Sequence, residues 1–267
     1  MSFETESTVV EFLPATFSGY ATGALDIRMA ARRIISIPTQ LGCRVGCTFC
    51  VSSKTPVVRN LTCEEMVEMV RICLTSAPAD GRPIELSFTG EGEAVLNWRE
   101  TQQVCEAMPG LSSDFTAVRY CFSGIGADKL LQKLSGGPYP MRLQFSLHAA
   151  RQEVRDKLIP RSLPLATVLD ALRANAERFA TIELNVVLQD GVNDSAADLA
   201  VLADWGDAAW PIVLNPLLGD GKECCAAAMD HFEATLQAAG RRVLRYAKIG
   251  RRISRDRIYP LMSATLK

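Results

Sequence analysis

The feature that most constrains the fold of this chain is a regular alternation of strand signals and helix signals. Short β-branched or apolar runs occur at residues 33–38, 84–91, 116–124, 141–149, 181–189 and 211–217. Amphipathic stretches follow them, and one begins with the capping-box residues Thr62 and Glu65. Strand followed by helix, repeated six times, predicts a parallel sheet with right-handed crossovers. We therefore expect one α/β domain, built as an open sheet or as a partial or full barrel.

The composition is that of a globular protein of enzyme size. The chain has 267 residues and 48% apolar content, which is enough to fill a substantial core. The amino terminus has no signal-peptide pattern, and no apolar run approaches the roughly 20 residues that span a bilayer. These features predict a soluble, cytoplasmic protein. Nine cysteines is an odd number without a secretory signal, so metal binding or burial is expected instead of a complete disulfide framework.

Three of the nine cysteines lie close together, as Cys43-x3-Cys47-x2-Cys50. A structural zinc site needs four ligands, and the sequence has no second Cys-x2-Cys pair. Three cysteines on a [4Fe–4S] cluster leave one iron open, and the amino and carboxylate groups of S-adenosylmethionine are suited to bind it. With Phe49 before the last cysteine, the motif resembles the signature of the radical SAM superfamily. The alternatives are chance clustering and a zinc site completed by His148.

Other predicted strands end in residues that suit the same cofactor. Gly92 and Glu93 follow the second strand, where glycine lets the backbone approach a ligand and a carboxylate can accept from an ammonium group. Ser123 ends the third strand and Ser146 the fourth, which places hydroxyls where ribose or carboxylate oxygens can lie. The cysteine motif itself follows the first strand, at the carboxyl end where barrel active sites are built.

Taken together, these stretches are similar to the RlmN/Cfr branch of the superfamily, which methylates adenosine in ribosomal and transfer RNA. The similarity covers roughly residues 36–250, including the sequences Arg-Asn-Leu-Thr at 59–62 and Ser-Leu-His-Ala at 146–149. It implies a partial (β/α)6 barrel of the TIM type, a cluster on the three cysteines and cofactor contacts near Gly92, Glu93, Ser123 and Ser146. We expect residues 1–35 to form an amino-terminal extension and residues 36–267 to form the core, with a last strand and a basic tail.

The sequence departs from this branch where the methyl group is carried. The family's relay uses one cysteine near the carboxyl terminus and a second just upstream of the motif. Here no cysteine precedes Cys43, with Ser36 at the expected place, and none follows Cys225; by spacing, the carrier position falls near Asp256. The family's RNA-binding domain is not expected, because 42 residues precede Cys43. An asparagine expected to touch the cofactor is displaced to Asn215 or lost.

The segment 241–257 carries eight basic residues and one acidic residue, although the net charge of the chain is −1. It is either a charged strand edge or an anion-binding wall. Each guanidinium group can bind two phosphate or carboxylate oxygens at once, so we expect a small anionic substrate. The candidate substrate-binding residues are Arg245, Lys248, Arg251, Arg252 and Arg255. Asp256 is a candidate polar contact or proton acceptor, or a salt-bridge partner of its neighbours.

The sequence therefore predicts a radical SAM enzyme. With a reductant such as flavodoxin or ferredoxin, the cluster would cleave S-adenosylmethionine to a 5′-deoxyadenosyl radical that abstracts hydrogen from the substrate. One alternative is methylation of RNA or a nucleotide by an altered relay with Cys224 or Cys225 as methyl acceptor, with RNA the less favoured substrate. Another is a non-catalytic scaffold that only binds a cluster. No membrane partner is expected.

Overall fold

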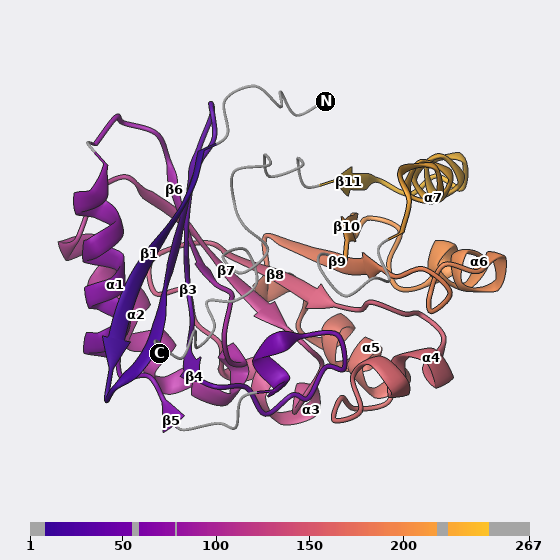
Figure 1. The fold of residues 1–267 in the computed structure, drawn as a ribbon, viewed down its shortest axis with the longest axis horizontal. Helices are drawn as coiled ribbons and strands as arrows, with labels where there is room; N and C mark the ends of the chain where they lie inside the picture. The colour runs from indigo at the N-terminus through magenta and orange to yellow at the C-terminus, as the bar shows by residue number, and fades with distance from the viewer. Residues whose placement is uncertain (1–8, 55–58, 78, 218–223, 246–267) are drawn as a thin grey trace.

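The computed structural model describes residues 9–54, 59–77, 79–217 and 224–245 (Figure 1). These residues form a nine-stranded sheet and a separate two-stranded ladder. In spatial order, the main sheet contains β1 (Val9–Phe17), β2 (Tyr20–Arg28), β3 (Arg33–Ile37), β6 (Ile84–Phe88), β7 (Phe115–Phe122), β8 (Met141–Ser146), β9 (Thr181–Leu188), β10 (Ile212–Pro216) and β11 (Val243–Arg245). The ladder pairs β4 (Gln40–Leu41) with β5 (Arg59–Asn60).

Helices connect most of the parallel strands and lie along one side of the curved sheet (Figure 1). They are α1 (Cys63–Ser76), α2 (Trp98–Ala107), α3 (Ala127–Leu130), α4 (Gln152–Leu158), α5 (Leu165–Ala174), α6 (Ala196–Asp204) and α7 (Ala226–Ala238). Short 3-10 turns are η1 (Val51–Lys54), η2 (Ala94–Asn97), η3 (Met108–Gly110), η4 (Leu131–Lys133) and η5 (Ala176–Arg178). The predicted capping box opens α1, because Thr62 accepts from the amide of Glu65 while Glu65 accepts from the amide of Thr62.

From β3 to β11 every pair of neighbouring strands is parallel. The six predicted strands correspond to β3, β6, β7, β8, β9 and β10, and β11 extends the series. Within the described residues β1 and β11 are not paired with each other, so the sheet remains open. The expected α/β fold of the partial-barrel type is confirmed.

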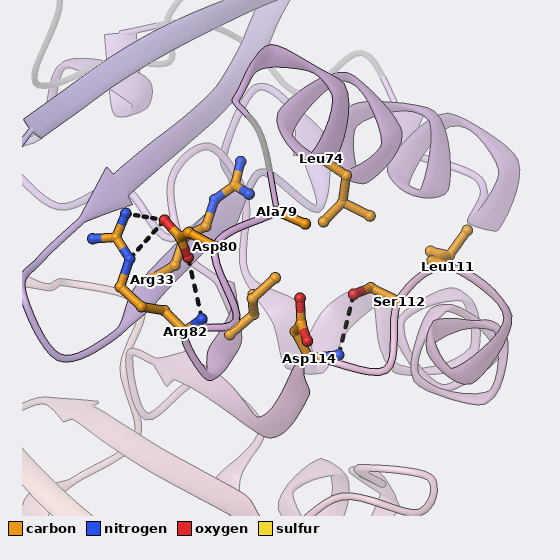
Figure 2. Close-up of a pocket in the computed structure, with 9 residues that line it drawn as sticks. Arg33, Leu74, Ala79, Asp80, Arg82, Leu111, Ser112 and Asp114 are labelled. Atoms are coloured by element: carbon orange, nitrogen blue, oxygen red, sulfur yellow. Dashed lines mark hydrogen bonds and ion pairs between the residues drawn. The ribbon is translucent and has the colours of Figure 1, made fainter.

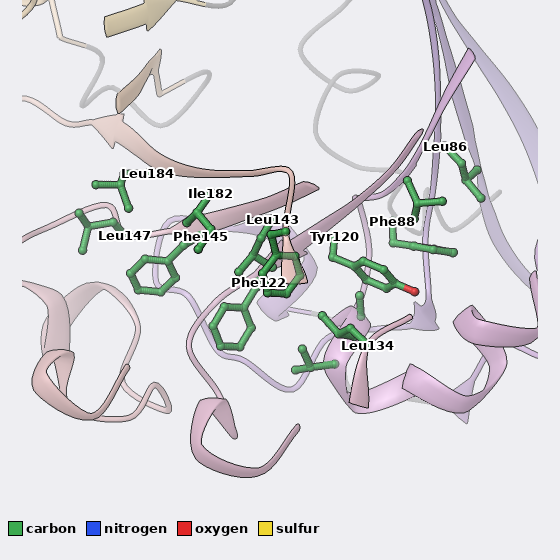
Figure 3. Close-up of a cluster of buried hydrophobic side chains, with 14 of the residues drawn as sticks. Leu86, Phe88, Tyr120, Phe122, Leu134, Leu143, Phe145, Leu147, Ile182 and Leu184 are labelled. Atoms are coloured by element: carbon green, nitrogen blue, oxygen red, sulfur yellow. The ribbon is translucent and has the colours of Figure 1, made fainter. Parts of the chain in front are cut away.

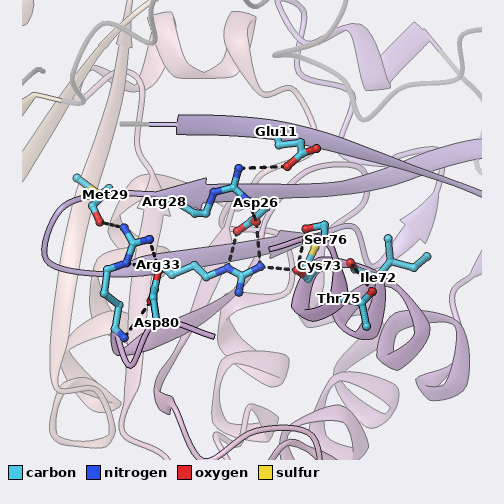
Figure 4. Close-up of polar contacts among 11 residues, drawn as sticks. Glu11, Asp26, Arg28, Met29, Arg33, Ile72, Cys73, Thr75, Ser76 and Asp80 are labelled. Atoms are coloured by element: carbon cyan, nitrogen blue, oxygen red, sulfur yellow. Dashed lines mark hydrogen bonds and ion pairs between the residues drawn. The ribbon is translucent and has the colours of Figure 1, made fainter. Parts of the chain in front are cut away.

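The amino-terminal segment adds two strands to this sheet, a feature that the strand–helix alternation does not predict. β1 pairs with β2 and β2 with β3, both antiparallel. The turn between β1 and β2 is Ser18–Gly19, and both residues have positive φ, 51° and 74°, as a tight hairpin turn requires. Arg33 of β3 is buried and pairs with Asp26 of β2 at 2.7 Å, which fixes the hairpin to the parallel sheet (Figure 4).

Alternate residues of the central strands form the main apolar core, which packs toward the helices (Figure 3). Its strand members include Leu86, Phe88, Tyr120, Phe122, Leu143, Phe145, Ile182 and Leu184. Each fully buried Leu or Phe side chain contributes about 1.5–3 kcal/mol. The intervening residues of the same strands lie on the opposite, concave face and are mostly polar or charged, as Glu85, Arg119, Gln144 and Glu183 are. At the carboxyl ends of the parallel strands, this face borders the loops described next.

Candidate active site

The three cysteines of the motif lie in the loop between β4 and η1, and each side chain is partly buried. The loop leans on the segment that follows β8, since the amide of Thr48 donates to the carbonyl of Leu158 at 2.9 Å. Cys43 and Cys47 pack against a small apolar cluster formed by Val45, Ala149, Val154, Leu158 and Ile159. The motif is therefore held at the carboxyl end of the sheet, beside the ends of both β3 and β8.

The donor set of this loop fits an iron–sulfur cluster. Burial raises the pKa of the Cys43 thiol to about 11 and also raises that of Cys47, and the nearby Glu93 adds to both shifts. Thiolates in such surroundings need a bound metal to stabilise their charge. No group of three His, Cys, Asp or Glu side chains in the described part of the chain can hold a metal ion. That finding does not exclude a cluster, because its cysteines bind different irons.

Gly92 and Glu93 lie beside this loop. Glu93 is 4% exposed, and its Oε2 accepts from the amide of Ser123 at 3.0 Å. Its own amide donates to Oε1 of Gln40 at 3.0 Å. Gly92 has φ 98°, and a Cβ there would lie 2.7 Å from Gln40, so only glycine fits. Burial raises the pKa of Glu93 to about 7.

The side chains of Glu93 and Ser123 each carry a polar atom without a well-formed hydrogen bond to the described residues. These atoms are Oε1 of Glu93 and Oγ of Ser123, and both residues are buried, with exposed fractions of 4% and 6%. Unsatisfied buried polar atoms are costly in a native protein unless a ligand or water completes them. Glu93 and Ser123 thus mark a polar ligand site between the ends of β6 and β7.

Glu91 is a second buried carboxylate in the same loop, and sequence reasoning did not single it out. It is 1% exposed, and its Oε1 accepts from the hydroxyl of Tyr20 at 2.7 Å. Its carbonyl accepts from the amide of Thr39 at 3.0 Å. Burial raises the pKa of Glu91 to about 7. The amino-terminal hairpin thus contacts the loop that carries Gly92 and Glu93.

Ser146 and Asn215 also lie on the concave face. Ser146, at the end of β8, is partly buried and aligns with Asn185 of β9. The side-chain amide of Asn215 in β10 donates to the side chain of Asn185. Buried Arg155 donates to the carbonyls of Ser146 and Ser123, which fixes the ends of β7 and β8 relative to each other.

A polar network covers the concave face below these strand ends. Arg119 of β7 donates to Glu85 at 2.7 Å and to Glu183 at 2.6 Å, and all three side chains are at most 9% exposed. Gln144 donates to Glu183 at 3.1 Å. In the sequence, this network is indicated only by the alternation of polar and apolar residues in strands that helices flank. Alternation shows which residues share a face of the sheet, but not which of them pair with one another.

The structure describes only residues 241–245 of the basic segment 241–257. Arg241 is 5% exposed and donates to backbone carbonyls that include those of Ala203 and Trp205, so it has a structural role. Arg245 aligns with Leu214 of β10, a residue of the helix-side core, and pairs with two acidic residues of α7. The register thus assigns the Arg245 side chain to the helix side of β11, where its charge is already paired. The other candidates, Lys248, Arg251, Arg252, Arg255 and Asp256, lie outside the described residues.

Three further residues from the sequence analysis have defined surroundings. Cys224 is buried in the core and its thiol donates to Asp194 at 3.7 Å, whereas Cys225 is exposed at the start of α7. Burial raises the pKa of Cys224 to about 12. His148 accepts from the amide of Val187 at 3.1 Å, and burial lowers its pKa to about 3. One nitrogen of the His148 ring is thus engaged with the backbone of β9.

A hollow elsewhere in the described structure lies at the amino-terminal end of β6, away from the motif (Figure 2). Its lining includes Arg33 and Arg82, which already pair with Asp26 and Asp80. In barrels this end of the strands serves stability, whereas active sites lie at the carboxyl end. We assign it no function. None of the described helices is both long and apolar enough to cross a membrane.

The topology and the three-cysteine loop define a cluster-binding α/β enzyme of the partial-barrel type. Residues 37–203 match the family model described as the radical SAM superfamily, and the chain belongs to this superfamily. Its cofactors are accordingly a [4Fe–4S] cluster and S-adenosylmethionine. The non-catalytic scaffold is thereby set aside.

Relatives place the chain near one branch of the superfamily. It is 30% identical over 234 residues to a probable dual-specificity RNA methyltransferase RlmN of Bifidobacterium adolescentis, covering 79% of this chain and 60% of that protein. A probable RNA methyltransferase of Rhodopseudomonas palustris is 33% identical over 83% of this chain and 62% of its own length. The chain thus spans about 60% of the length of these relatives.

A crystal structure of a radical SAM methyltransferase from Sphaerobacter thermophilus superimposes with a TM-score of 0.79. The match covers 94% of this chain and 76% of that one, at 25% sequence identity. Because the match covers nearly the whole chain, the similarity extends beyond residues 37–203, to which the family model is matched.

Proposed function

We propose that this enzyme cleaves S-adenosylmethionine reductively and abstracts a hydrogen atom from a small substrate bound at the carboxyl end of the barrel. The observation that supports this proposal most strongly is the pair of buried atoms without a well-formed hydrogen bond to the described residues, Oε1 of Glu93 and Oγ of Ser123, beside the three-cysteine loop. When bound, the cluster and S-adenosylmethionine supply the radical for hydrogen abstraction.

Each residue of the site has a proposed task. Cys43, Cys47 and Cys50 hold the cluster. Glu93 accepts a hydrogen bond from the ammonium group of S-adenosylmethionine through its free oxygen, and the charge of that ammonium favours the ionised carboxylate. The further contacts that we propose are the backbone at Gly92 and the side chains of Ser123, Ser146 and Asn215.

The test is the formation of 5′-deoxyadenosine and methionine by the anaerobically reconstituted protein with dithionite. We expect both products from the parent and neither from Cys47→Ala, because the loss of one thiolate leaves an incomplete cluster site. Cys63→Ser is the matched control, since it changes a partly buried thiol at the first residue of α1, to which no role in the site is given. If the parent forms no 5′-deoxyadenosine, the proposal is wrong.

The substrate is proposed to be anionic, on the basis of the charge of segment 241–257. Because Arg241 and Arg245 already have partners, the proposal depends on Lys248, Arg251, Arg252 and Arg255. A screen of nucleotides, sugar phosphates and carboxylic acids for stimulation of 5′-deoxyadenosine formation tests it. Stimulation by folded RNA alone would reject it.

The printed names of the two curated relatives favour a second candidate, the methylation of RNA by an altered relay. In that reaction Cys225 is the better acceptor, because it is exposed whereas Cys224 is buried. Intact-mass measurement of the purified protein, followed by peptide mapping, decides between the candidates. A methylated cysteine at position 225 would support the relay, and an unmodified protein that yields no methylated RNA would exclude it.

A further inference from the structure

Cys121 is a thiol on the concave face of the barrel. It lies in β7 between the core residues Tyr120 and Phe122, and it aligns with Gln144 of β8. Alternation along the strand therefore directs Cys121 to the face opposite the helices. It is partly buried, whereas Cys73 and Cys105 are fully buried within the apolar core.

The sulfur of Cys121 belongs to a chain of hydrogen bonds. It lies 2.7 Å from Oγ1 of Thr89, which in turn lies 2.7 Å from Oγ of Ser87. On its other side it donates to Oε1 of Gln144 at 3.5 Å. Hydroxyl groups both donate and accept, so this chain can return a proton to the sulfur after the sulfur has lost its hydrogen.

The ligand site described above lies directly beyond this thiol. Ser123 follows the last residue of β7, Phe122, and lies two positions beyond Cys121, which corresponds to about 7 Å in extended chain. Its hydroxyl and Oε1 of Glu93 are the buried atoms, without a well-formed hydrogen bond to the described residues, that indicate a ligand there. A molecule bound to Glu93 and Ser123 would therefore lie over the carboxyl end of β7, two positions beyond Cys121.

We propose that Cys121 is the hydrogen-atom donor that ends the reaction, an inference that rests on the proposed function. A carbon radical takes the hydrogen of the thiol: a C–H bond forms, the S–H bond breaks, and a thiyl radical remains. One electron from the low-potential donor that also reduces the cluster, and one proton through Thr89, restore the thiol. The substrate then regains the hydrogen that it lost. Its class is a molecule that is epimerised or rearranged without net oxidation.

The isotopic test needs only S-adenosylmethionine and dithionite in D2O, without a substrate. The thiol exchanges its proton with solvent, so we expect the parent to form 5′-deoxyadenosine that carries one solvent deuterium. Cys121→Ser should still form 5′-deoxyadenosine but lose this deuterium, whereas Cys63→Ser, a change at the first residue of α1, should retain it. Equal iron and sulfide contents in all three proteins show that the variants assemble the site.

The outcomes separate the two proposals. If the parent forms no 5′-deoxyadenosine, the proposed function fails and this inference fails with it. If 5′-deoxyadenosine forms without deuterium, or if Cys121→Ser retains the label, only the role of Cys121 is overturned.

A second measurement does not depend on turnover. The reconstituted protein is treated with methyl methanethiosulfonate under anaerobic conditions, with or without S-adenosylhomocysteine, and the peptide that contains Cys121 is quantified by mass spectrometry. We expect modification of Cys121 in the free protein and its loss when S-adenosylhomocysteine is bound, with Cys225 modified equally in both samples. Equal modification of Cys121 in both samples, or none in either, would reject its position beside the ligand.

Discussion

Tyr120 and Cys121 are neighbours in β7, but their side chains belong to faces of the sheet with opposite chemistry. Tyr120 packs among Phe88 and other apolar residues under the helices, with ring centroids 4.9 Å apart. Cys121 contacts hydroxyl and amide groups on a face where Arg119 is held by two carboxylates. The helix-side face supplies the apolar burial that stabilises the fold. On the concave face, buried polar groups lower the stability of the fold, because burial removes them from water. The position of this face beside the ligand site explains why they are there.

This comparison predicts that changes on the helix-side face act on folding and leave the chemistry of folded molecules intact. Phe145 is fully buried in β8 and stacks on Trp205, with centroids 5.6 Å apart. We expect Phe145→Ala to lower the free energy of unfolding by about 3–5 kcal/mol, because it leaves a cavity. Urea unfolding measures the loss, and Phe145→Leu is the milder control. A folded fraction of Phe145→Ala that binds S-adenosylmethionine much more weakly than the parent would break the comparison.

The buried carboxyl group of Glu93 at the site should make the free energy of unfolding depend on pH. Burial raises the pKa of Glu93 from its ordinary value of 4.5 to about 7, so the folded state holds this proton more tightly than the unfolded state does. The contribution of Glu93 is therefore fully present below pH 4.5 and is lost as pH rises to about 7. Its slope is at most about 1.4 kcal/mol per pH unit. We expect Glu93→Gln to remove this part of the slope in urea titrations.

Glu106→Gln, an exposed change on α2, is the control for that titration and should leave the slope unchanged. Part of the parent's slope should remain in Glu93→Gln, because burial also raises the pKa of Glu91 to about 7. An unchanged slope in Glu93→Gln would mean that its carboxyl does not hold a proton in the folded protein.

The smallest effect is expected at Arg245, which the strand register assigns to the helix side. Its two ion pairs, with Asp230 and Glu233, are partly exposed. Arg245→Ala should therefore change the free energy of unfolding by about 0–1 kcal/mol. The rate of 5′-deoxyadenosine formation should not change. A clear loss of substrate stimulation in this variant, measured with the best compound from the anion screen, would place Arg245 on the concave face after all.

The order of the elements was predictable from the sequence, because each strand and each helix carries its own local signal. The capping box of Thr62 and Glu65 and the position of the three cysteines after the first parallel strand are of this kind. The amino-terminal hairpin was missed because it does not follow the strand–helix alternation. Its Ser18–Gly19 turn is a local signal that the repeated pattern obscured.

The partners within the site were not predictable, because they come from different strands. Glu85, Arg119 and Glu183 meet across β6, β7 and β9, and their meeting depends on strand order and register. The face of Arg245 depends on the register of a three-residue strand, in which a shift by one residue reverses the direction of every side chain. Local periodicity encodes neither the order of the strands nor their register.

The amino-terminal hairpin has one more consequence, for how copies of this protein behave in a crowded solution. In the described sheet β1 is an edge strand, and free edges can pair with strands of other molecules. Pro14 lies in the middle of β1, opposite Gly23 of β2, and proline has no amide hydrogen to offer a further strand. An added chain would meet a gap in its ladder at that position. The hairpin thus protects this side of the open barrel against edge-to-edge aggregation.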